Sequence, residues 1–179
     1  MNLCSKLIDK KMVYNGDFLK MRVDKIKLPN EKISSMEFVK HSDAACVLAI
    51  DDDNNILMVK QYRYPISQII YEVPAGKMDE NETPIECASR ELEEETGYKA
   101  EKLELIGEIY TAPAYSTEKI YIYLASGLTR GKVNLDDDEF LECEKINFNQ
   151  VLNMILNNEI DDAKTQISIL KYLAINGKK

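Results

Sequence analysis

The sequence predicts an α/β fold in which a mixed sheet lies between helical layers and an antiparallel β meander precedes it. Short alternating or wholly apolar segments, separated by turn signals, occupy most of the chain up to residue 146. One strongly capped helix interrupts them at residues 83–97, and two further helical segments follow the last strand. No repeat or linker divides the 179 residues. We expect a β extension at residues 1–42, followed by one main domain at residues 43–179.

The N-terminal extension is predicted to form hairpins. Residues 12–14 and 18–23 flank Asn15-Gly16-Asp17, a strong turn signal, and residues 25–28 and 36–39 flank a second turn. These strands alternate polar and apolar residues, so each has one face to bury, yet such a short meander has little core of its own. We therefore expect it to pack on something else, such as a second subunit.

The main domain is predicted to begin with a buried strand. Residues 44–50 are continuously apolar, as in a strand covered on both faces. Three adjacent aspartates follow in residues 51–55; they could hold a cation, but Asp and Asn are common turn formers, and we interpret the segment as a turn. Further strands are predicted at residues 56–59, 103–111, 118–125 and 140–146, and helices at residues 148–157 and 161–176. Residues 69–75 lead directly into the loop at Gly76.

The central helix carries clear signals at both ends. Thr83 is a good N-cap, Pro84 suits the first helical position, and Glu86 completes a capping box. Gly97 ends the helix, where a left-handed residue is favoured. Between them, an apolar stripe is expected from Ile85, Ala88 and Leu92.

The acidic residues of this helix form an unusual group. Glu91, Glu94 and Glu95 fall on one patch beside the apolar stripe, and Arg90 is the only base within the helix. Like charges one turn apart destabilise a helix by roughly 0.2–0.5 kcal/mol per pair. A divalent cation among the carboxylates would reverse that effect, because Mg2+ prefers oxygen ligands. The alternative is an acidic, solvated helix face.

The pattern extends beyond the helix. It fits Gly-x5-Glu-x7-Arg-Glu-U-x-Glu-Glu-x-Gly-U, where U is a bulky apolar residue, through Gly76, Glu82, Arg90, Glu91, Leu92, Glu94, Glu95, Gly97 and Tyr98. A chance match in a chain of this length is on the order of one in ten million at average residue usage. The segment resembles the Nudix box, complete and without substitution, and the resemblance implies an α/β/α sandwich. We therefore reject the solvated face as the interpretation of the acidic patch.

The chain is most similar to the ADP-ribose pyrophosphatase branch of the Nudix family. The resemblance extends from about residue 12 to about residue 173. It rests on residues 28–30, 60–65 and 72–76, and on Pro113 with Ser116 and Glu118. The branch is marked by a proline sixteen residues after the glycine that closes the box, and Pro113 stands at that distance from Gly97.

The resemblance implies hydrolysis of the ADP-ribose pyrophosphate to AMP and ribose 5-phosphate by two or more Mg2+ ions, with Mn2+ as an alternative. The implied metal ligands are Glu91, Glu94, Glu95, Glu139 and the Ala75 carbonyl. The implied catalytic residues are Arg90, Glu94, Glu95, Asp137 and Glu139, with a late-loop acid as base or additional ligand. Asp137 departs from the glutamate common in the branch. Gly76, Glu82, Leu92 and Gly97 would support the box, and Glu82 could also belong to the metal site.

Substrate recognition is implied for residues outside the box: Arg63, Glu72, Pro113, Ser116 and Glu118. Arg63 could instead be an ordinary edge-strand arginine. His41, the only histidine, is expected to be structural. The branch is dimeric through its leader strands, so a homodimer is expected. The alternatives are another nucleoside diphosphate sugar, a dinucleotide or a nucleoside triphosphate as substrate, or a non-catalytic ligand-binding Nudix module.

Composition excludes several other classes. With 31 acidic and 23 basic residues the formal charge is −8, which argues against general binding to nucleic acid or anionic membranes. The four cysteines are widely spaced and there is one histidine, so no zinc pattern is present. The N-terminus lacks a secretory apolar segment, and no apolar run is long enough to span a bilayer. We expect a cytoplasmic protein.

Overall fold

The computed structural model describes residues 3–135 and 139–177. It divides into two compact units, the first formed by Met1–Asp43 with Tyr110–Lys119 and the second by Ala44–Ile109 with Ile120–Lys179. The boundary after Asp43 lies beside the one expected from sequence, but the first unit also takes in a later loop, because that loop pairs with β3 through Val39 and Ser116.

The first unit is an antiparallel meander. Its strands are β1 (Lys6–Asn15), β2 (Lys20–Lys27) and β3 (Ile33–Lys40), in the order β1-β2-β3. The two segments expected around residue 24 are a single strand, because Asp24 does not turn the chain: its carboxylate accepts hydrogen bonds from the Arg22 guanidinium at 2.6 and 2.8 Å. The side chains of β1 are exposed along its whole length, so this meander has almost no core of its own.

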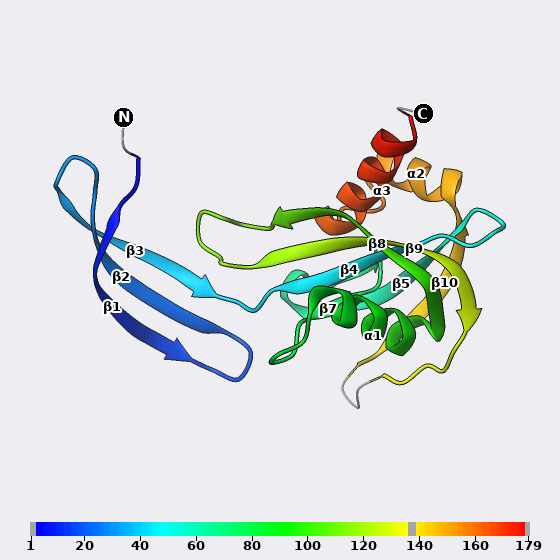
Figure 1. Cartoon of the computed structure of the whole chain (residues 1–179), viewed down its shortest axis with the longest axis horizontal. Coiled ribbons are helices and arrows are strands. Elements are labelled where there is room, and N and C mark those ends of the chain that lie inside the picture. The colour runs from blue at the N-terminus through cyan, green and yellow to red at the C-terminus, as the bar shows by residue number, and fades with distance from the viewer. Residues whose placement is uncertain (1–2, 136–138, 178–179) are drawn as a thin grey trace. The chain divides into compact units, whose positions relative to one another are not determined.

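The second unit contains the remaining elements, drawn in Figure 1. They are β4 (Ala44–Ala49), β5 (Asn55–Arg63), the short 3-10 helix η1 (Tyr64–Ile66), β6 (Gln68–Glu72), β7 (Ala75–Lys77), α1 (Pro84–Thr96), β8 (Tyr98–Tyr110), β9 (Lys119–Arg130), β10 (Leu141–Asn147), α2 (Phe148–Leu156) and α3 (Ala163–Asn176). The sheets have the orders β7-β4-β9-β8 and β10-β5-β6. The first is mixed, since β4 runs parallel to β9 and antiparallel to β7.

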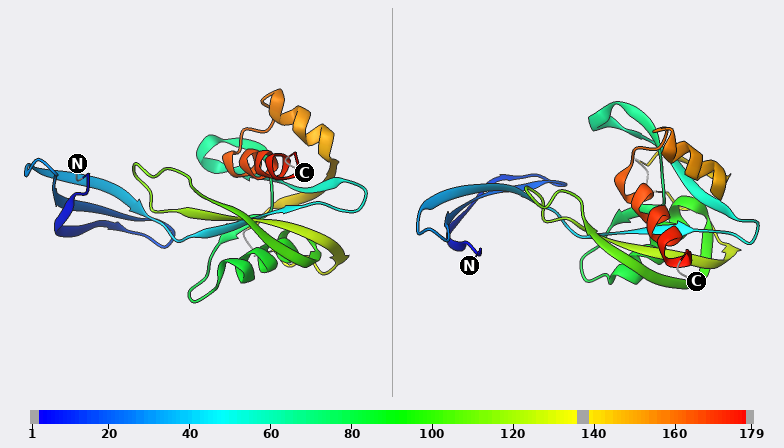
Figure 2. Two further views of the ribbon diagram at one scale, coloured as in Figure 1. Left: turned by 45° about the horizontal axis from the view of Figure 1, so that its top comes forward. Right: turned by 90° about the horizontal axis from the view of Figure 1, so that it is seen from above.

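Strand β4 explains the layers of this unit. Its residues alternate between two cores: Ala44, Cys46 and Leu48 face one that includes α2 and α3. Ala45, Val47 and Ala49 face the other, which includes α1. Figure 2 shows the sheet between α1 on one side and α2 and α3 on the other. The predicted α/β/α sandwich with a mixed sheet, preceded by a β meander, is confirmed.

Two local features lie near the sheet, and the first was expected from the sequence. The aspartate-rich segment is a turn, because Asp51 accepts hydrogen bonds from the backbone N–H groups of Asp53 and Asn55. Pro74 lies between β6, which pairs with β5, and β7, which pairs with β4. Over the part of the chain that is described, no helix has the length and apolar character needed to cross a bilayer.

Candidate active site

Helix α1 begins and ends as its sequence predicts. The Thr83 N–H donates to the Glu86 carboxylate at 2.9 Å, which forms the expected capping box. Gly97 has φ 69° and donates its N–H to the Glu93 carbonyl at 2.8 Å. A Cβ at Gly97 would also lie 2.8 Å from Val133, so this position suits only glycine. These caps fix the register of the acidic side chains between them.

The buried face of α1 differs from the predicted stripe. Ile85 is exposed, whereas Cys87, Ala88 and Leu92 are fully buried. Glu91 and Glu95 lie on this buried face with exposed fractions of 7% and 5%, rather than beside it. Ile85 stays in solvent because it belongs to the first turn, ahead of the part of the helix that packs on the sheet. The carboxylates therefore replace apolar residues at the inner face of the helix.

Arg90 connects the acids of the box. Its Nε and Nη2 donate to the Glu82 carboxylate at 2.8 and 2.9 Å. Its Nη1 donates to Glu91 at 2.6 Å and to Glu94 at 3.0 Å. One guanidinium thus fixes three carboxylates, and Glu82 in particular raises the pKa of Arg90 far above its ordinary value.

Gly76 leaves space for Glu91. A Cβ at Gly76 would lie 1.9 Å from Glu91 Oε1, an impossible separation. The neighbouring residue Ala75 donates its N–H to Glu95 Oε2 at 3.0 Å. The short strand β7 therefore holds both buried carboxylates of the helix against its backbone, one by close approach and one by a hydrogen bond.

The two buried carboxylates carry an unfavourable charge density. Burial raises the pKa of Glu95 to about 8, and the nearby charge of Glu91 adds to the effect. Burial also raises the pKa of Glu91 to about 7, even though Arg90 opposes the shift. Within residues 3–135 and 139–177, no lysine or arginine lies within ion-pair distance of Glu95. A cation from solution would stabilise the ionised pair.

The late-loop acids are only partly covered by the structure. Asp137 lies outside the described residues. Glu139 is half-buried, and its charge contributes to the raised pKa values of both Glu91 and Glu95. Glu139 is therefore in electrostatic reach of the box carboxylates.

The donor set fits a hard divalent cation in its chemistry. The candidate ligands Glu91, Glu94, Glu95, Glu139 and the Ala75 carbonyl all offer oxygen, which Mg2+ and Mn2+ prefer. Among the residues described, no three acidic, histidine or cysteine side chains are grouped as a preformed cation site. Arg90 draws Glu91 and Glu94 toward itself, so binding of an ion would require these carboxylates to turn.

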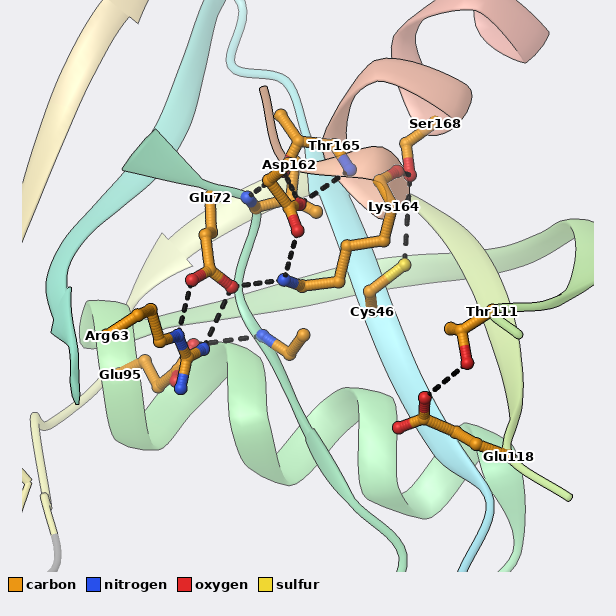
Figure 3. Close-up of polar contacts among 12 residues, drawn as sticks. Cys46, Arg63, Glu72, Glu95, Thr111, Glu118, Asp162, Lys164, Thr165 and Ser168 are labelled. Carbon is orange, nitrogen blue, oxygen red and sulfur yellow. Dashed lines mark hydrogen bonds and ion pairs between the residues drawn. The ribbon is translucent and has the colours of Figure 1, made fainter. Parts of the chain in front are cut away.

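Arg63 and Glu72 form a bidentate pair. Arg63 Nε and Nη2 donate to the two Glu72 oxygens at 2.5 and 2.8 Å. Glu72 is 3% exposed and is also bound by Lys164 from α3. Burial alone would raise the pKa of Glu72, but the bond from Arg63 and the charge of Lys164 outweigh it, and the pKa lies below its ordinary value. Figure 3 shows this group together with Glu95.

The other expected substrate residues belong to the first unit. Pro113 is exposed, and Ser116 Oγ accepts a hydrogen bond from the Glu118 N–H at 3.2 Å. Glu118 accepts a hydrogen bond from the Thr111 hydroxyl at 2.6 Å (Figure 3). His41 Nδ1 lies 2.7 Å from the Ser42 carbonyl and 3.4 Å from Glu118, so this nitrogen faces two acceptor groups.

Sequence reasoning missed Lys164 and Asp162. Its Nζ contacts Asp162 at 3.1 Å, and Asp162 caps α3 by accepting from the Thr165 N–H at 2.9 Å. The sequence did contain a signal: a lysine in the first turn of a helix opposes the macrodipole, so it requires a compensating acid. The acid that compensates it most closely, Glu72, lies 92 residues away in sequence.

Comparison with known proteins places these features in context. The model of the NUDIX domain family matches residues 40–167. The chain is 41% identical over 176 residues to the ADP-ribose pyrophosphatase of Bacillus subtilis (strain 168), covering 97% of this chain and 95% of the relative. It is 39% identical over 172 residues to the methanol dehydrogenase activator of Bacillus methanolicus, covering 95% and 92%.

A solved structure supports the fold. The crystal structure of an ADP compounds hydrolase matches with a TM-score of 0.87 and covers 100% of both chains. The two sequences are 19% identical, so this likeness concerns the fold alone.

Proposed function

The chain belongs to the NUDIX family, and from this membership we propose that it hydrolyses the pyrophosphate of ADP-ribose to AMP and ribose 5-phosphate. The observation that carries the proposal is the buried pair Glu91 and Glu95 within a complete box, in a chain that matches an ADP-ribose pyrophosphatase over nearly its full length. In the reaction, the water oxygen forms a bond to one phosphorus while the bond from that same phosphorus to the bridging oxygen breaks, and the other phosphate leaves with the bridging oxygen.

Divalent cations, Mg2+ or Mn2+ and two or more per site, would be held by Glu91, Glu94, Glu95, Glu139 and the Ala75 carbonyl. Such ions supply charge neutralisation of the pyrophosphate and a more acidic water. The protein contributes the placement: Arg90 orients Glu82, Glu91 and Glu94, and β7 holds Glu95. Glu139 or Asp137 would accept the proton from the attacking water.

Substrate choice must come from residues outside the box, because the box addresses only the pyrophosphate. Tyr62 and Tyr64 are 51% and 81% exposed on either side of Arg63, so their rings are accessible for stacking an adenine. Cation–π and stacking contacts of this kind contribute roughly 0.5–2 kcal/mol. Roles for Pro113, Ser116 and Glu118 in binding the terminal ribose remain predictions.

The direct test is a substrate panel. ADP-ribose, ADP-glucose, GDP-mannose and a dinucleotide such as NAD+ are incubated at matched concentration with Mg2+, with Mn2+ or with a chelator, and the products are separated by chromatography. We expect the largest kcat/KM for ADP-ribose and no turnover with the chelator. A larger kcat/KM for a hexose nucleotide or a dinucleotide would contradict the substrate assignment but not the reaction class.

A second candidate function rests on the similarity to a methanol dehydrogenase activator over 95% of the chain. On this proposal the chain raises the activity of a methanol dehydrogenase. Adding the chain to a steady-state assay of that enzyme tests it, and the Glu95→Gln variant shows whether any activation requires hydrolysis. An unchanged dehydrogenase rate would remove this candidate.

We also propose that the chain forms a homodimer through its first unit. Strands β1 to β3 and their turns expose an unusual number of large apolar side chains: Leu7, Ile8, Met12, Val13, Tyr14, Phe18, Leu19, Ile33 and Met36. Regular strands with so much exposed apolar surface need a partner to bury it. Light scattering on the full chain is expected to give the mass of a dimer, and a monomer at micromolar concentration would contradict the proposal.

A further inference from the structure

Lys164 is a buried cation at an unfavourable place in its helix. It lies in the first turn of α3, where the helix macrodipole disfavours positive charge, and its side chain is only 12% exposed. A buried ammonium of this kind is tolerated only when it is paired and hydrogen-bonded. The groups that bind Lys164 should therefore explain why it is buried at this position.

The partners of Lys164 form a closed group of four charges. Lys164 Nζ binds Glu72 and lies 3.1 Å from Asp162, and Glu72 in turn receives the bidentate contact from Arg63. Figure 3 shows the chain of contacts from Asp162 through Lys164 and Glu72 to Arg63. We call these residues the Lys164 quartet. It contains two acids and two bases, so its formal charge is zero.

Hydrogen bonds of Thr165 join the two segments that carry Lys164 and Glu72. The Thr165 hydroxyl donates to Asp162 at 2.6 Å and accepts from the Val73 N–H at 2.9 Å. Val73 directly follows Glu72, so the start of α3 is bonded to the end of β6 through the same residues that carry the charges. This double attachment leaves the Glu72 carboxylate little freedom to turn.

Arg63 is the member of the quartet that reaches solvent. Its side chain is 41% exposed, whereas that of Glu72 is 4% exposed. Glu72 uses Nε and Nη2 of the guanidinium, which leaves Nη1 outside the pair. The hydrogen bond to Glu72 is the main cause of the raised pKa of Arg63, and the charge of Glu95 adds to it, so the guanidinium lies within electrostatic reach of the box.

We propose that Lys164 is a positioning residue for the reaction, which holds Glu72 so that Arg63 presents its free guanidinium edge to a phosphate of the substrate. This inference rests on the proposed function, because it assigns Arg63 to the pyrophosphate substrate. Glu72 then acts on the substrate through Arg63 and not by direct contact, since its carboxylate is already engaged by both cations. Without Lys164, Glu72 is held by Arg63 alone and the pair can move as one.

The competing explanation is that Lys164 only stabilises the fold. The two differ in kinetics. A purely structural loss lowers the fraction of active protein, so kcat and the melting temperature fall while KM stays unchanged. A positioning loss weakens the phosphate contact made by Arg63, so KM and the dissociation constant rise while kcat changes little.

The experiment compares Lys164→Met with Lys171→Met. Lys171 lies in the same helix and donates to the Ile106 carbonyl, so its removal controls for loss of a helix lysine. With ADP-ribose, Lys164→Met is expected to raise KM about tenfold with kcat within about twofold of the unmodified chain. Binding of α,β-methylene-ADP, whose pyrophosphate bond is replaced, is expected to weaken about tenfold by calorimetry. Lys171→Met should change neither quantity.

If Lys164→Met does not fold, the double variant D162N/K164M tests the proposal in its place. It removes one charge of each sign, and asparagine retains the N-cap of α3. A normal KM in this folded double variant, or an equal change in Lys171→Met, would overturn the proposal. The unmodified chain is first assayed on the substrate panel, so that a failure of ADP-ribose as substrate is seen separately. The kinetic comparison is then made with the nucleoside diphosphate substrate that has the highest kcat/KM. If the unmodified chain fails to bind α,β-methylene-ADP, the proposal is also overturned.

Discussion

Glu72 and Glu95 are both buried carboxylates of the second unit, with exposed fractions of 3% and 5%, yet their charges are compensated in opposite ways. Glu72 is bound by Arg63 and Lys164, and its pKa is lowered although burial acts to raise it. Glu95 accepts a hydrogen bond from the Ala75 N–H, faces the like charge of Glu91, and has a pKa raised to about 8, chiefly by burial.

The difference shows where the chain supplies its own counter-charge and where it does not. Burial of an unpaired carboxylate costs several kcal/mol, and a fold retains such a group only if something else compensates it. At Glu72 the compensation is internal, so the carboxylate serves to hold other groups in place. At Glu95 we propose that a divalent cation from solution compensates the charge, which explains why the fold retains this buried carboxylate.

Replacing Glu95 tests the uncompensated side of the comparison and has the largest expected effect. Glu95→Gln keeps the shape and the acceptor for the Ala75 N–H but removes the charge. We expect turnover to fall about a hundredfold or more, corresponding to about 2.7 kcal/mol of transition-state free energy. The melting temperature of the protein without divalent ions should not fall, because burial already disfavours the ionised form of Glu95 when no cation is bound.

Glu93→Gln is the matched control for this variant. Glu93 lies in the same helix but is more exposed and pairs with Lys99 at 3.2 Å, so its replacement should leave turnover within about twofold. Near-normal turnover in a folded Glu95→Gln protein would refute the metal-site assignment for the box.

Replacing Glu72 tests the compensated side, and here the expected loss is of stability. Glu72→Gln leaves Lys164 and Arg63 without their shared carboxylate. Removing one partner of a buried ion pair costs about 3–5 kcal/mol. We expect about 2 kcal/mol for this change, since the amide keeps one acceptor and Arg63 is partly solvated. Urea unfolding measures the difference.

Glu142→Gln in β10 provides the comparison, because Glu142 is an exposed strand acid of the same unit. Its free energy of unfolding should change by less than about 0.5 kcal/mol. Equal stabilities for Glu72→Gln and the unmodified protein would mean that the quartet does not stabilise the fold.

The contrast between the two acids also marks the limit of sequence reasoning. The caps of α1, the box residues and the strands were predictable because their signals are local: Thr83 and Glu86 are one helical turn apart, and β4 is apolar throughout. The buried position of Glu91 and Glu95 was not, since periodicity placed them beside the stripe and Ile85 within it. Which residues face the core depends on where the helix meets β4 and β7.

Long-range ion pairing was beyond prediction for a similar reason. Glu72 was expected at the substrate through family resemblance, but nothing near it in sequence indicates Lys164. The contact arises because α3 returns over the sheet after β10 and places its first turn at the end of β6. The roles assigned to Asp137, Glu139 and the loop with Pro113, Ser116 and Glu118 stay predictions, and they need kinetic tests of their own.

The smallest expected effect concerns acid pH and sharpens the comparison at Glu72. A carboxylate with a lowered pKa in the folded state contributes stability above its unfolded pKa and loses that contribution as pH falls through the folded value. The Glu72 pKa lies below the ordinary 4.5, so its contribution is complete at neutral pH and declines below about pH 4.5. The stability gap between the unmodified protein and Glu72→Gln should therefore narrow by about half between pH 6 and pH 3. Urea unfolding of both proteins across this range measures the gap, and a gap that stays constant to pH 3 would show that the quartet does not lower the pKa of Glu72 in the folded protein.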